Sequence, residues 1–384
     1  MDGEIAADVT DAEAAVARLN AGAAALVDTE ALARILLRAE AVASSRIEGL
    51  EIGARRLLHA EVGRRLHQAS SDVTAIEVLN NIDAMVFAVE SIGSGDAITT
   101  ELLLDVHRRL VLGTRLEEYG GLIRDQQNWI GGSSYNPCSA AFVPPPPELV
   151  EDLLADLCEF CCNDDLPAVA QAAIAHAQFE TIHPFVDGNG RTGRALIHIV
   201  LRRRGLALRV LPPVSLVLAT WAWSYIDGLT QFRHVGSSTS AEALEGLNTW
   251  VGRFSAACSR SVQDATAFEE QTAELQKDWR SRLGTVRANS GTDLLLRVLP
   301  GAPILTVDSA ASLIGRTFNP ASEAIQRLVG AGILHQVNVG RRNRAFEAPE
   351  VIAAFTDLER QLRSPEGDTR SSASVRRVPH RRAD

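Results

Sequence analysis

The chain has 384 residues, a formal net charge of −10, 46% hydrophobic residues and 22% charged residues. These ordinary values exclude a largely disordered chain, and the length suffices for roughly two to three domains. The net acidity argues against a protein that coats nucleic acid through bulk charge, although one basic face stays open. No run approaches the roughly 20 apolar residues of a membrane span, and the acidic N-terminus is unlike a secretory signal. We expect a soluble cytoplasmic protein with no membrane partner.

Apolar residues recur three and four positions apart along most of the chain, which predicts a mainly helical fold. The first such patterns cover about 28–66 and 72–91, and Thr99 or Thr100 could cap the next helix. The segment 120–147 differs, because it holds two glycine pairs and four consecutive prolines. It predicts a loop with a short hairpin. Helices are expected again over 148–162 and 168–182.

A change of composition after about residue 256 marks a second region. Residues 266–286 predict a long polar connecting helix. Three short helices at 293–299, 307–314 and 320–329, followed by a strand–turn–strand pattern over 333–346, predict a winged helix-turn-helix. The tail from 364 is rich in Ser and Arg and lacks periodicity, so we expect it to be disordered.

The third short helix, over 320–329, is the candidate for DNA recognition, together with a wing that carries Arg341, Arg342 and Arg344. Because this helix displays only one positive charge, Arg327, protein contact or dimerisation is favoured. DNA binding is kept as the alternative.

The most informative segment is 183–194, HPFVDGNGRTGR. Pro184 ends the preceding helix and leaves His183 on its last turn, at the edge of a loop. Gly188 and Gly190 let the backbone turn sharply and approach a ligand. The apolar-periodic run that follows starts a new helix, whose first amides are unpaired donors with positive dipole character.

Charged side chains add to this helix start. Arg191 and Arg194 lie near one face of its first turn, and two guanidinium groups beside free amides suit a polyphosphate. Asp187 on the loop is placed to hold a magnesium ion that bridges phosphate oxygens. His183 would lie beside the phosphates, with a side chain able to accept a proton near neutral pH.

The same segment resembles the signature of the Fic family, H-P-F-x-[DE]-G-N-G-R-x-x-R, and every fixed position is filled. The resemblance covers about 98–204 well and extends loosely to about 254. It implies an all-α fold, a helical bundle with a short β-hairpin flap, before the small winged-helix domain. It also implies an enzyme that moves AMP from ATP to a Ser, Thr or Tyr hydroxyl of a target protein or of itself, and releases pyrophosphate.

The resemblance and the sequence patterns described above together divide the chain into five parts. They are an N-terminal helical region (1–96), a Fic catalytic core (97–260), a connecting helix (261–288), a winged-helix domain (289–362) and a disordered tail (363–384).

The resemblance also implies roles for single residues. His183 would be the general base, and Asp187 would bind Mg²⁺. Arg191 would hold the γ-phosphate of ATP, and Tyr225 would line the adenine, with a core aromatic as the alternative for Tyr225. The full set of implied nucleotide contacts is Gly188, Asn189, Gly190, Arg191, Arg194 and Tyr225.

Two further segments resemble parts of the family. Residues 44–49, SSRIEG, resemble its inhibitory motif [ST]-x-x-x-E-[GN], in the class with an N-terminal inhibitory helix. Ser44 and Glu48 are four apart, hence on one helical face. Glu48 is predicted to pair with Arg191 and to replace the γ-phosphate. The flap that would hold the target as an added strand corresponds to Trp129, Ile130, Gly131 and Gly132.

Two other functions stay open. One is a nucleotide-sensing DNA-binding regulator. The other is a Fic enzyme that removes AMP, with Glu48 activating water, or that transfers another phosphate-containing group. A homodimer is also compatible with the sequence.

Overall fold

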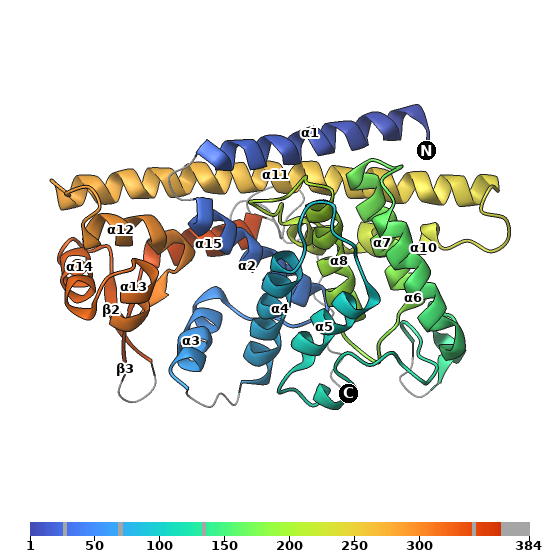
Figure 1. Ribbon diagram of the computed structural model, residues 1–384, viewed down its shortest axis with the longest axis horizontal. Helices are drawn as coiled ribbons and strands as arrows, with labels where there is room; N and C mark the ends of the chain where they lie inside the picture. The colour runs from blue at the N-terminus through green and yellow to red at the C-terminus, as the bar shows by residue number, and fades with distance from the viewer. Residues whose placement is uncertain (26–28, 68–71, 133–135, 340–342, 362–384) are drawn as a thin grey trace, which may run out of the picture.

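The computed structural model describes residues 1–25, 29–67, 72–132, 136–339 and 343–361. Its longest element, α11 (Ala241–Leu283), has 43 residues and extends over about 65 Å at 1.5 Å per residue. The N-terminal helix α1 (Gly3–Ala25) lies along it, with a helical bundle below and the C-terminal elements beside one end (Figure 1). The mainly helical fold predicted from the sequence is confirmed.

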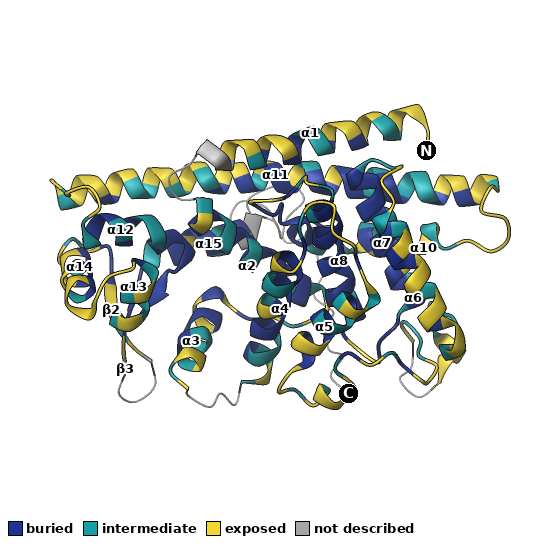
Figure 2. Cartoon of the chain, viewed as in Figure 1, coloured by how far each residue is buried: buried dark blue, intermediate teal, exposed yellow. Residues whose placement is uncertain are grey.

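The bundle surrounds two central helices, α7 (Ala168–Ile182) and α8 (Asn189–Arg203). Most residues of α7 are buried, and many of them are alanines, whose small side chains let α8 approach closely. Helix α8 is itself almost wholly buried (Figure 2). The surrounding helices are α2 (Thr29–Ile47), α3 (Ala54–Arg65), α4 (Val73–Glu90), α5 (Thr100–Val111), α6 (Pro147–Cys162), α9 (Val214–Thr220) and α10 (Ala222–Phe232).

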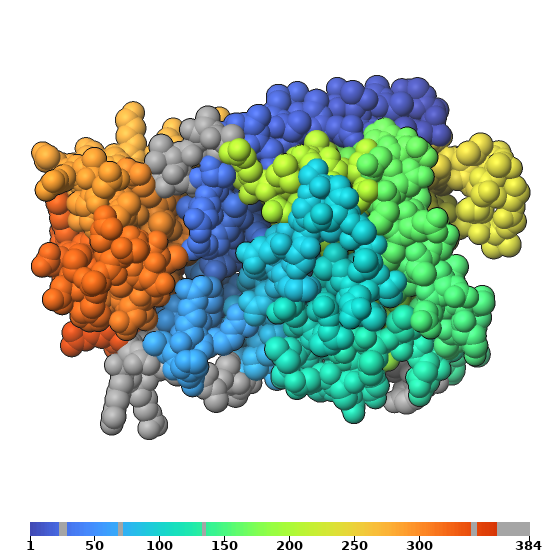
Figure 3. Space-filling view, in the orientation of Figure 1, coloured from blue at the N-terminus to red at the C-terminus, as the bar shows by residue number. Residues whose placement is uncertain are grey.

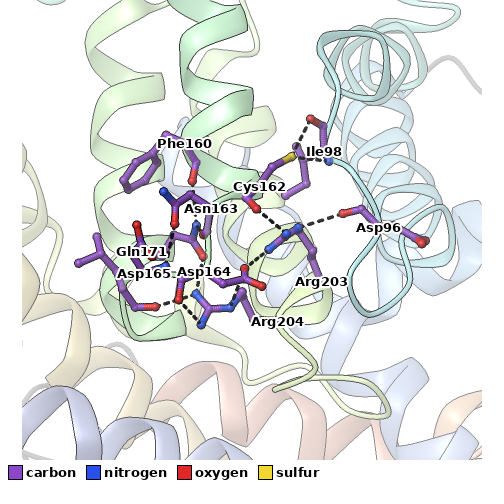
Figure 4. A network of polar contacts seen from close by, with 11 residues as sticks. Asp96, Ile98, Phe160, Cys162, Asn163, Asp164, Asp165, Gln171, Arg203 and Arg204 are labelled. Carbon is purple, nitrogen blue, oxygen red and sulfur yellow. Dashed lines mark hydrogen bonds and ion pairs between the residues drawn. The ribbon is translucent and has the colours of Figure 1, made fainter.

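The C-terminal end of α8 is fixed by two consecutive arginines (Figure 4). Arg203 donates to the carbonyl oxygens of Asp96 and Cys162 and pairs with Asp164. Arg204 donates to the Oε1 of Gln171, 2.8 Å away on α7. With this end anchored to three neighbouring segments, the opposite end of α8 is held in a defined place.

The C-terminal elements contain the expected helices and hairpin. The helices are α12 (Gly291–Val298), α13 (Val307–Leu313) and α14 (Phe318–Gly330), and the hairpin is β2 (His335–Val339) and β3 (Asn343–Glu347). Three elements were not predicted: the 3-10 turn η3 (Leu299–Gly301), strand β1 (Ile304–Leu305) and helix α15 (Pro349–Gln361). The antiparallel sheet has the order β1-β3-β2. Arg341 and Arg342 of the expected wing lie outside the described residues, as does the tail from 362.

These C-terminal elements lie directly beside the early helices (Figure 3). Arg55 on α3 donates from Nη2 and Nε to the two carboxylate oxygens of Glu347, at 2.6 and 3.1 Å. The turn η3 packs on α2, where a Cβ on Gly301 would lie 2.8 Å from the Cα of Ala31. The helix that precedes the candidate inhibitory motif therefore touches the C-terminal elements.

Two expectations about helix bounds were wrong. The pattern over 28–66 is two helices, because the chain turns at Gly49, whose φ is +81°, and α3 begins only after Gly53. Helix α11 continues through residue 260 with neither Gly nor Pro between Gly252 and Gly284, so the connecting helix is continuous with the core. Helix α1 was not predicted. Among the described residues, no helix is both long and apolar enough to span a membrane.

Candidate active site

The loop between α7 and α8 reverses the chain within six residues, and two left-handed residues make the reversal. His183 caps α7 with φ 51° and ψ 60°, and Gly188 precedes α8 with φ 79°. The Asn189 side chain closes the loop, since its Oδ1 accepts from the Phe185 N–H and its Nδ2 donates to the Phe185 carbonyl, both at 2.8 Å. Phe185 is fully buried beneath the loop.

His107 on α5 supports this loop from below, a role that the sequence did not indicate. Its ring stacks on Phe185 at 3.8 Å between centroids. Nδ1 accepts from the Gly121 N–H at 3.0 Å, so Nε2 carries the proton and donates to the Asp187 carbonyl, also at 3.0 Å. Burial lowers the pKa of His107 to about 4, which keeps the ring neutral.

Arg124 holds the same loop from the side of the flap. This buried guanidinium donates to the carbonyl oxygens of His183 (2.9 Å), Gln126 (3.0 Å) and Pro145 (2.5 Å). The Arg124 N–H donates to the Pro184 carbonyl at 2.9 Å. One side chain thus stabilises the left-handed turn that presents His183.

The first turn of α8 carries the two motif arginines, and both are buried. Arg191 has an Nε without a partner among the described residues. Arg194, 1% exposed, donates from Nε to the Ser44 Oγ and from Nη2 to the Ser44 carbonyl, both at 2.9 Å. Ser44 on the last turns of α2 therefore holds one of the two arginines in place.

Glu48 pairs with Arg194, and the expected pairing with Arg191 is wrong. Its Oε1 lies 2.6 Å from the Arg194 Nη2. Helix α2 ends at Ile47, so Glu48 lies in the following turn, where its N–H donates to the Ser45 carbonyl. From there the carboxylate reaches the guanidinium that Ser44 already holds.

The Glu48 carboxylate also covers the start of α8. A Cβ built on Gly190 would lie only 2.0 Å from the Glu48 Oε1. Burial acts to raise the pKa of Glu48, but the nearby Arg194, with Arg191 and His183, holds it below its ordinary value. An ionised carboxylate therefore occupies the place that the free amides and arginines would offer to an anion.

His183 is suited to accept a proton. Burial, together with the positive charge of Arg233, lowers the pKa of its imidazole to about 4, so the ring is neutral at pH 7. Its Nδ1 has no hydrogen-bond partner in the part of the chain that the structure describes.

Asp187 is the acidic residue of the loop, exposed to solvent, and its Oδ1 accepts from the Gly188 N–H. The described residues contain no group of three His, Cys, Asp or Glu side chains that could cage a metal. Mg²⁺ commonly binds one or two carboxylates and completes its shell with water and substrate phosphates. A single exposed carboxylate beside an anion site fits a magnesium ion that arrives with a nucleotide.

Behind Arg194 lies a buried polar cluster. The Tyr225 hydroxyl lies 2.9 Å from the Nε2 of His176 and accepts from Arg194 at 3.4 Å. Glu180 has an Oε1 without a partner among the described residues, and burial raises its pKa to about 7. Tyr225 is 5% exposed and supports Arg194, so its contact with an adenine stays a prediction.

The flap is a short two-stranded piece. Ile130 donates its N–H to the Phe142 carbonyl at 2.9 Å and accepts from the Ala141 N–H at 2.8 Å. Gly131 and Gly132 follow with φ near +75°, which explains the glycine pair. Trp129 is half-buried beside them, and residues 133–135 lie outside the described part.

Comparison with known proteins matches two family models. The model for the Fic/DOC family matches residues 97–201, and the model for the Fic/DOC family N-terminal region matches residues 6–90. Among solved structures, a Fic family protein from Desulfovibrio desulfuricans G20 aligns with a TM-score of 0.56 at 20% identity. The alignment covers 91% of this chain and 96% of that one, which shows a shared fold.

Curated relatives match about a third of the chain. Protein adenylyltransferase fic-1 of Caenorhabditis elegans is 36% identical over 134 residues, 34% of this chain and 23% of that protein. Protein adenylyltransferase Fic of Drosophila grimshawi is 36% identical over 140 residues, 35% of this chain and 27% of that protein. The match thus spans about a quarter of the length of these relatives. Together with the two family models, it shows a Fic/DOC domain over residues 97–201, preceded by the N-terminal region of that family over residues 6–90.

Proposed function

We propose that this protein is an autoinhibited protein adenylyltransferase, which moves AMP from ATP to a Ser, Thr or Tyr hydroxyl of a target protein or of itself. The names of its curated relatives support this activity. The observation that carries the proposal is the juxtaposition of a neutral His183 with the start of α8 and its two buried arginines.

In the proposed reaction, ATP lies with its phosphates against the first amides of α8, where the dipole and Arg194 offset their charge. His183 accepts the proton of the attacking hydroxyl, whose oxygen forms a bond to the α-phosphorus. The bond from the α-phosphorus to the bridging oxygen breaks, and pyrophosphate leaves with that electron pair. Positioning and charge neutralisation supply most of the acceleration, and a placed base adds on the order of 10²–10⁴-fold.

Mg²⁺ would enter with ATP and be held by the Asp187 carboxylate. Its chemistry there is to neutralise phosphate charge. The flap around Ile130 would hold the target's backbone as an added strand, which leaves the acceptor side chain directed toward His183.

Autoinhibition in this proposal rests on Glu48. Because its carboxylate pairs with Arg194 and covers Gly190, it competes with phosphate for the same groups. A nucleotide that binds beside Glu48 would not be contacted by Arg194, and its α-phosphate would be displaced from the line of attack of the hydroxyl.

The test uses Glu48→Gly, incubated with MgATP labelled on the α-phosphate. Glu51→Gly is the matched control, because Glu51 is an exposed carboxylate three residues further along. We expect label on the chain or on a lysate protein with Glu48→Gly only, and none after adding His183→Ala. Equal labelling with and without His183 would contradict the proposal. A product mass other than that of AMP, or loss of AMP from a modified substrate, would identify the transfer of another group or AMP removal instead.

For the C-terminal elements we propose contact with protein, including a second copy of the chain, in preference to DNA. Arg327, the positive charge of α14, donates to the Thr285 carbonyl at 2.6 Å and is thereby turned toward its own chain. Phe318 at the start of α14 is 53% exposed. Light scattering of the full chain with and without Phe318→Ser tests self-association, and tight, salt-dependent binding to duplex DNA would overturn this choice.

A further inference from the structure

Arg233 follows the last residue of α10 and lies between the flap and the end of α7, the helix that His183 caps. Its Cζ lies 4.1 Å above the ring centroid of Phe142. Its Nη2 donates to the Glu180 carbonyl at 3.2 Å, and its Nε donates to the Thr181 Oγ1 at 3.4 Å. Phe142 is the flap residue whose carbonyl accepts from Ile130.

We propose that Arg233 is a positioning residue. It binds the return segment of the flap (residues 141–145) to the last turn of α7, and so places a target hydroxyl at the right distance from His183. The proposal rests on the proposed transfer reaction and adds a residue beyond the family signature. Arg233 belongs to neither the 97–201 nor the 6–90 match.

The geometry explains why one residue can couple the two parts. Arg124 already binds the Pro145 carbonyl on the flap side to the Ile182 and His183 carbonyls. Arg233 binds Phe142, three residues earlier, to positions 180 and 181. Two arginines thus hold the return segment of the flap against consecutive residues of one helical turn, so the flap cannot shift without straining both contacts.

The charge of Arg233 acts on the same turn. The charged groups that face His183 are Arg233 from α10, Arg124 from the segment before the flap, and Glu48 from the turn after α2. Glu180 and Tyr225 are titratable groups that interact electrostatically with Arg233. Burial is the main cause of the lowered pKa of His183, and Arg233 is the largest contribution from a charge. Removing that positive charge should raise the pKa of the imidazole toward its ordinary value of about 6.5.

The test compares three variants in the Glu48→Gly background. Arg233→Met removes the charge and keeps an unbranched apolar side chain, whereas Arg233→Lys keeps the charge and loses the planar fork. Arg253→Met is the matched control. Arg253 also contacts α10, through Asp227 and the Ser224 carbonyl, but among the described residues no hydrogen bond or ion pair joins it to the flap or to α7.

Two readouts do not depend on catalysis. Hydrogen exchange of the peptide 126–145 should be faster in Arg233→Met than in the parent, because the Ile130 and Ala141 amides lose their support. The ring C–H signal of His183 should titrate at higher pH in Arg233→Met and at the parent's pH in Arg233→Lys. Arg253→Met should match the parent in both.

The third readout is self-modification with MgATP. We expect Arg233→Met to be slower by about a hundredfold at neutral pH, the effect of misplacing a reacting group by on the order of 1 Å. The acid limb of the pH–rate profile of Arg233→Met should move to higher pH together with the titration midpoint of His183. Unchanged flap exchange together with an unchanged His183 midpoint in Arg233→Met would overturn the proposal. If the parent itself transfers no AMP, the proposed function fails, and exchange and titration still decide the role of Arg233.

Discussion

The Oε1 of Glu48 lies 2.6 Å from the Nη2 of Arg194, across 146 positions of the sequence. The two partners differ in their freedom, since the Arg194 side chain is 1% exposed and the Glu48 side chain is 37% exposed. Ser44 holds the guanidinium through two further hydrogen bonds. Arg194 is therefore already in place for a phosphate, and Glu48 is the part that has to move.

Glu48→Gln should release the proposed inhibition only in part. The amide keeps the length and one oxygen of the side chain, but it loses the charge, and charge-assisted hydrogen bonds are roughly twice as strong as neutral ones. We expect a self-labelling rate between those of the wild type and Glu48→Gly. A rate equal to that of the wild type would show that shape, not charge, blocks the site.

The same pair should be insensitive to pH near neutrality. The pKa of Glu48 is held below its ordinary value, so the ion pair is fully present above that ordinary value and is lost only as pH falls through the lower folded-state pKa. We therefore expect no labelling by the wild type between pH 6 and 8. Labelling that appears in this range at the lower pH would contradict the assignment.

Gly193→Ala should destabilise the fold. A Cβ there would lie 2.8 Å from the Glu180 Oε1 and 2.9 Å from the Phe179 Cδ1, where α7 and α8 pack against each other. Overpacking of this kind costs about 1–3 kcal/mol in the free energy of unfolding, which urea denaturation measures. The control is Gly22→Ala on α1, where nothing lies within 4 Å and helix propensity predicts a gain of up to about 1 kcal/mol. If Gly193→Ala unfolds with the same free energy as the wild type, α7 and α8 can move apart to accommodate the added methyl group.

Much of the fold and of the site could be predicted from the sequence, because these parts depend on local patterns. Apolar spacing of three and four gave most helices, and the glycines and Pro184 placed a turn between α7 and α8. The left-handed conformations of His183 and Gly188 agree with that prediction. The predicted ion pair of Glu48 was wrong, because the sequence offers two arginines of the same motif as partners. Glu48 could in principle reach either arginine, and only the end of α2 at Ile47 and the bonds from Ser44 select Arg194.

The supporting residues could not be found in this way. His107, Arg124 and Arg233 act through backbone carbonyls and rings that are distant in sequence, and each sits on an ordinary helical or loop pattern. Glu180 belongs to no motif of the sequence, and its burial follows from the close approach of α8 to the alanine-rich α7. Long-range polar contacts need the packing to be known first.

Glu180→Gln should change how stability depends on pH. Burial raises the pKa of Glu180 to about 7, so its neutral form is favoured in the folded state. The stability associated with this proton is fully present below the ordinary pKa and is lost as pH rises toward 7, by up to about 1.4 kcal/mol per pH unit. His107, His176 and His183, whose pKa values are lowered, act in the opposite direction below pH 6.5.

The difference between wild type and variant isolates Glu180. In urea unfolding at pH 5, 6, 7 and 8, Glu180→Gln should gain relative to the wild type up to pH 7 and no further above it. A difference that stays constant with pH would mean that Glu180 is already ionised at pH 5, most simply through a pairing with Arg194.

Arg55→Ala should loosen the C-terminal elements from the early helices. Glu347 on β3 is 7% exposed in its side chain and accepts two hydrogen bonds from Arg55, with the Nε2 of His59 at 3.6 Å. Without Arg55 the buried carboxylate would keep, among the residues that the structure describes, only this longer contact, at a cost of about 1–3 kcal/mol. The control is Arg56→Ala, because Arg56 pairs with Asp72 on the surface and its loss should change the stability little.

Hydrogen exchange in α3 and over 333–347 should rise with Arg55→Ala alone. Because α2 also contacts η3, we expect the same variant to raise self-labelling by the otherwise wild-type chain; faster exchange without any gain in labelling would show that the C-terminal elements do not set the position of Glu48.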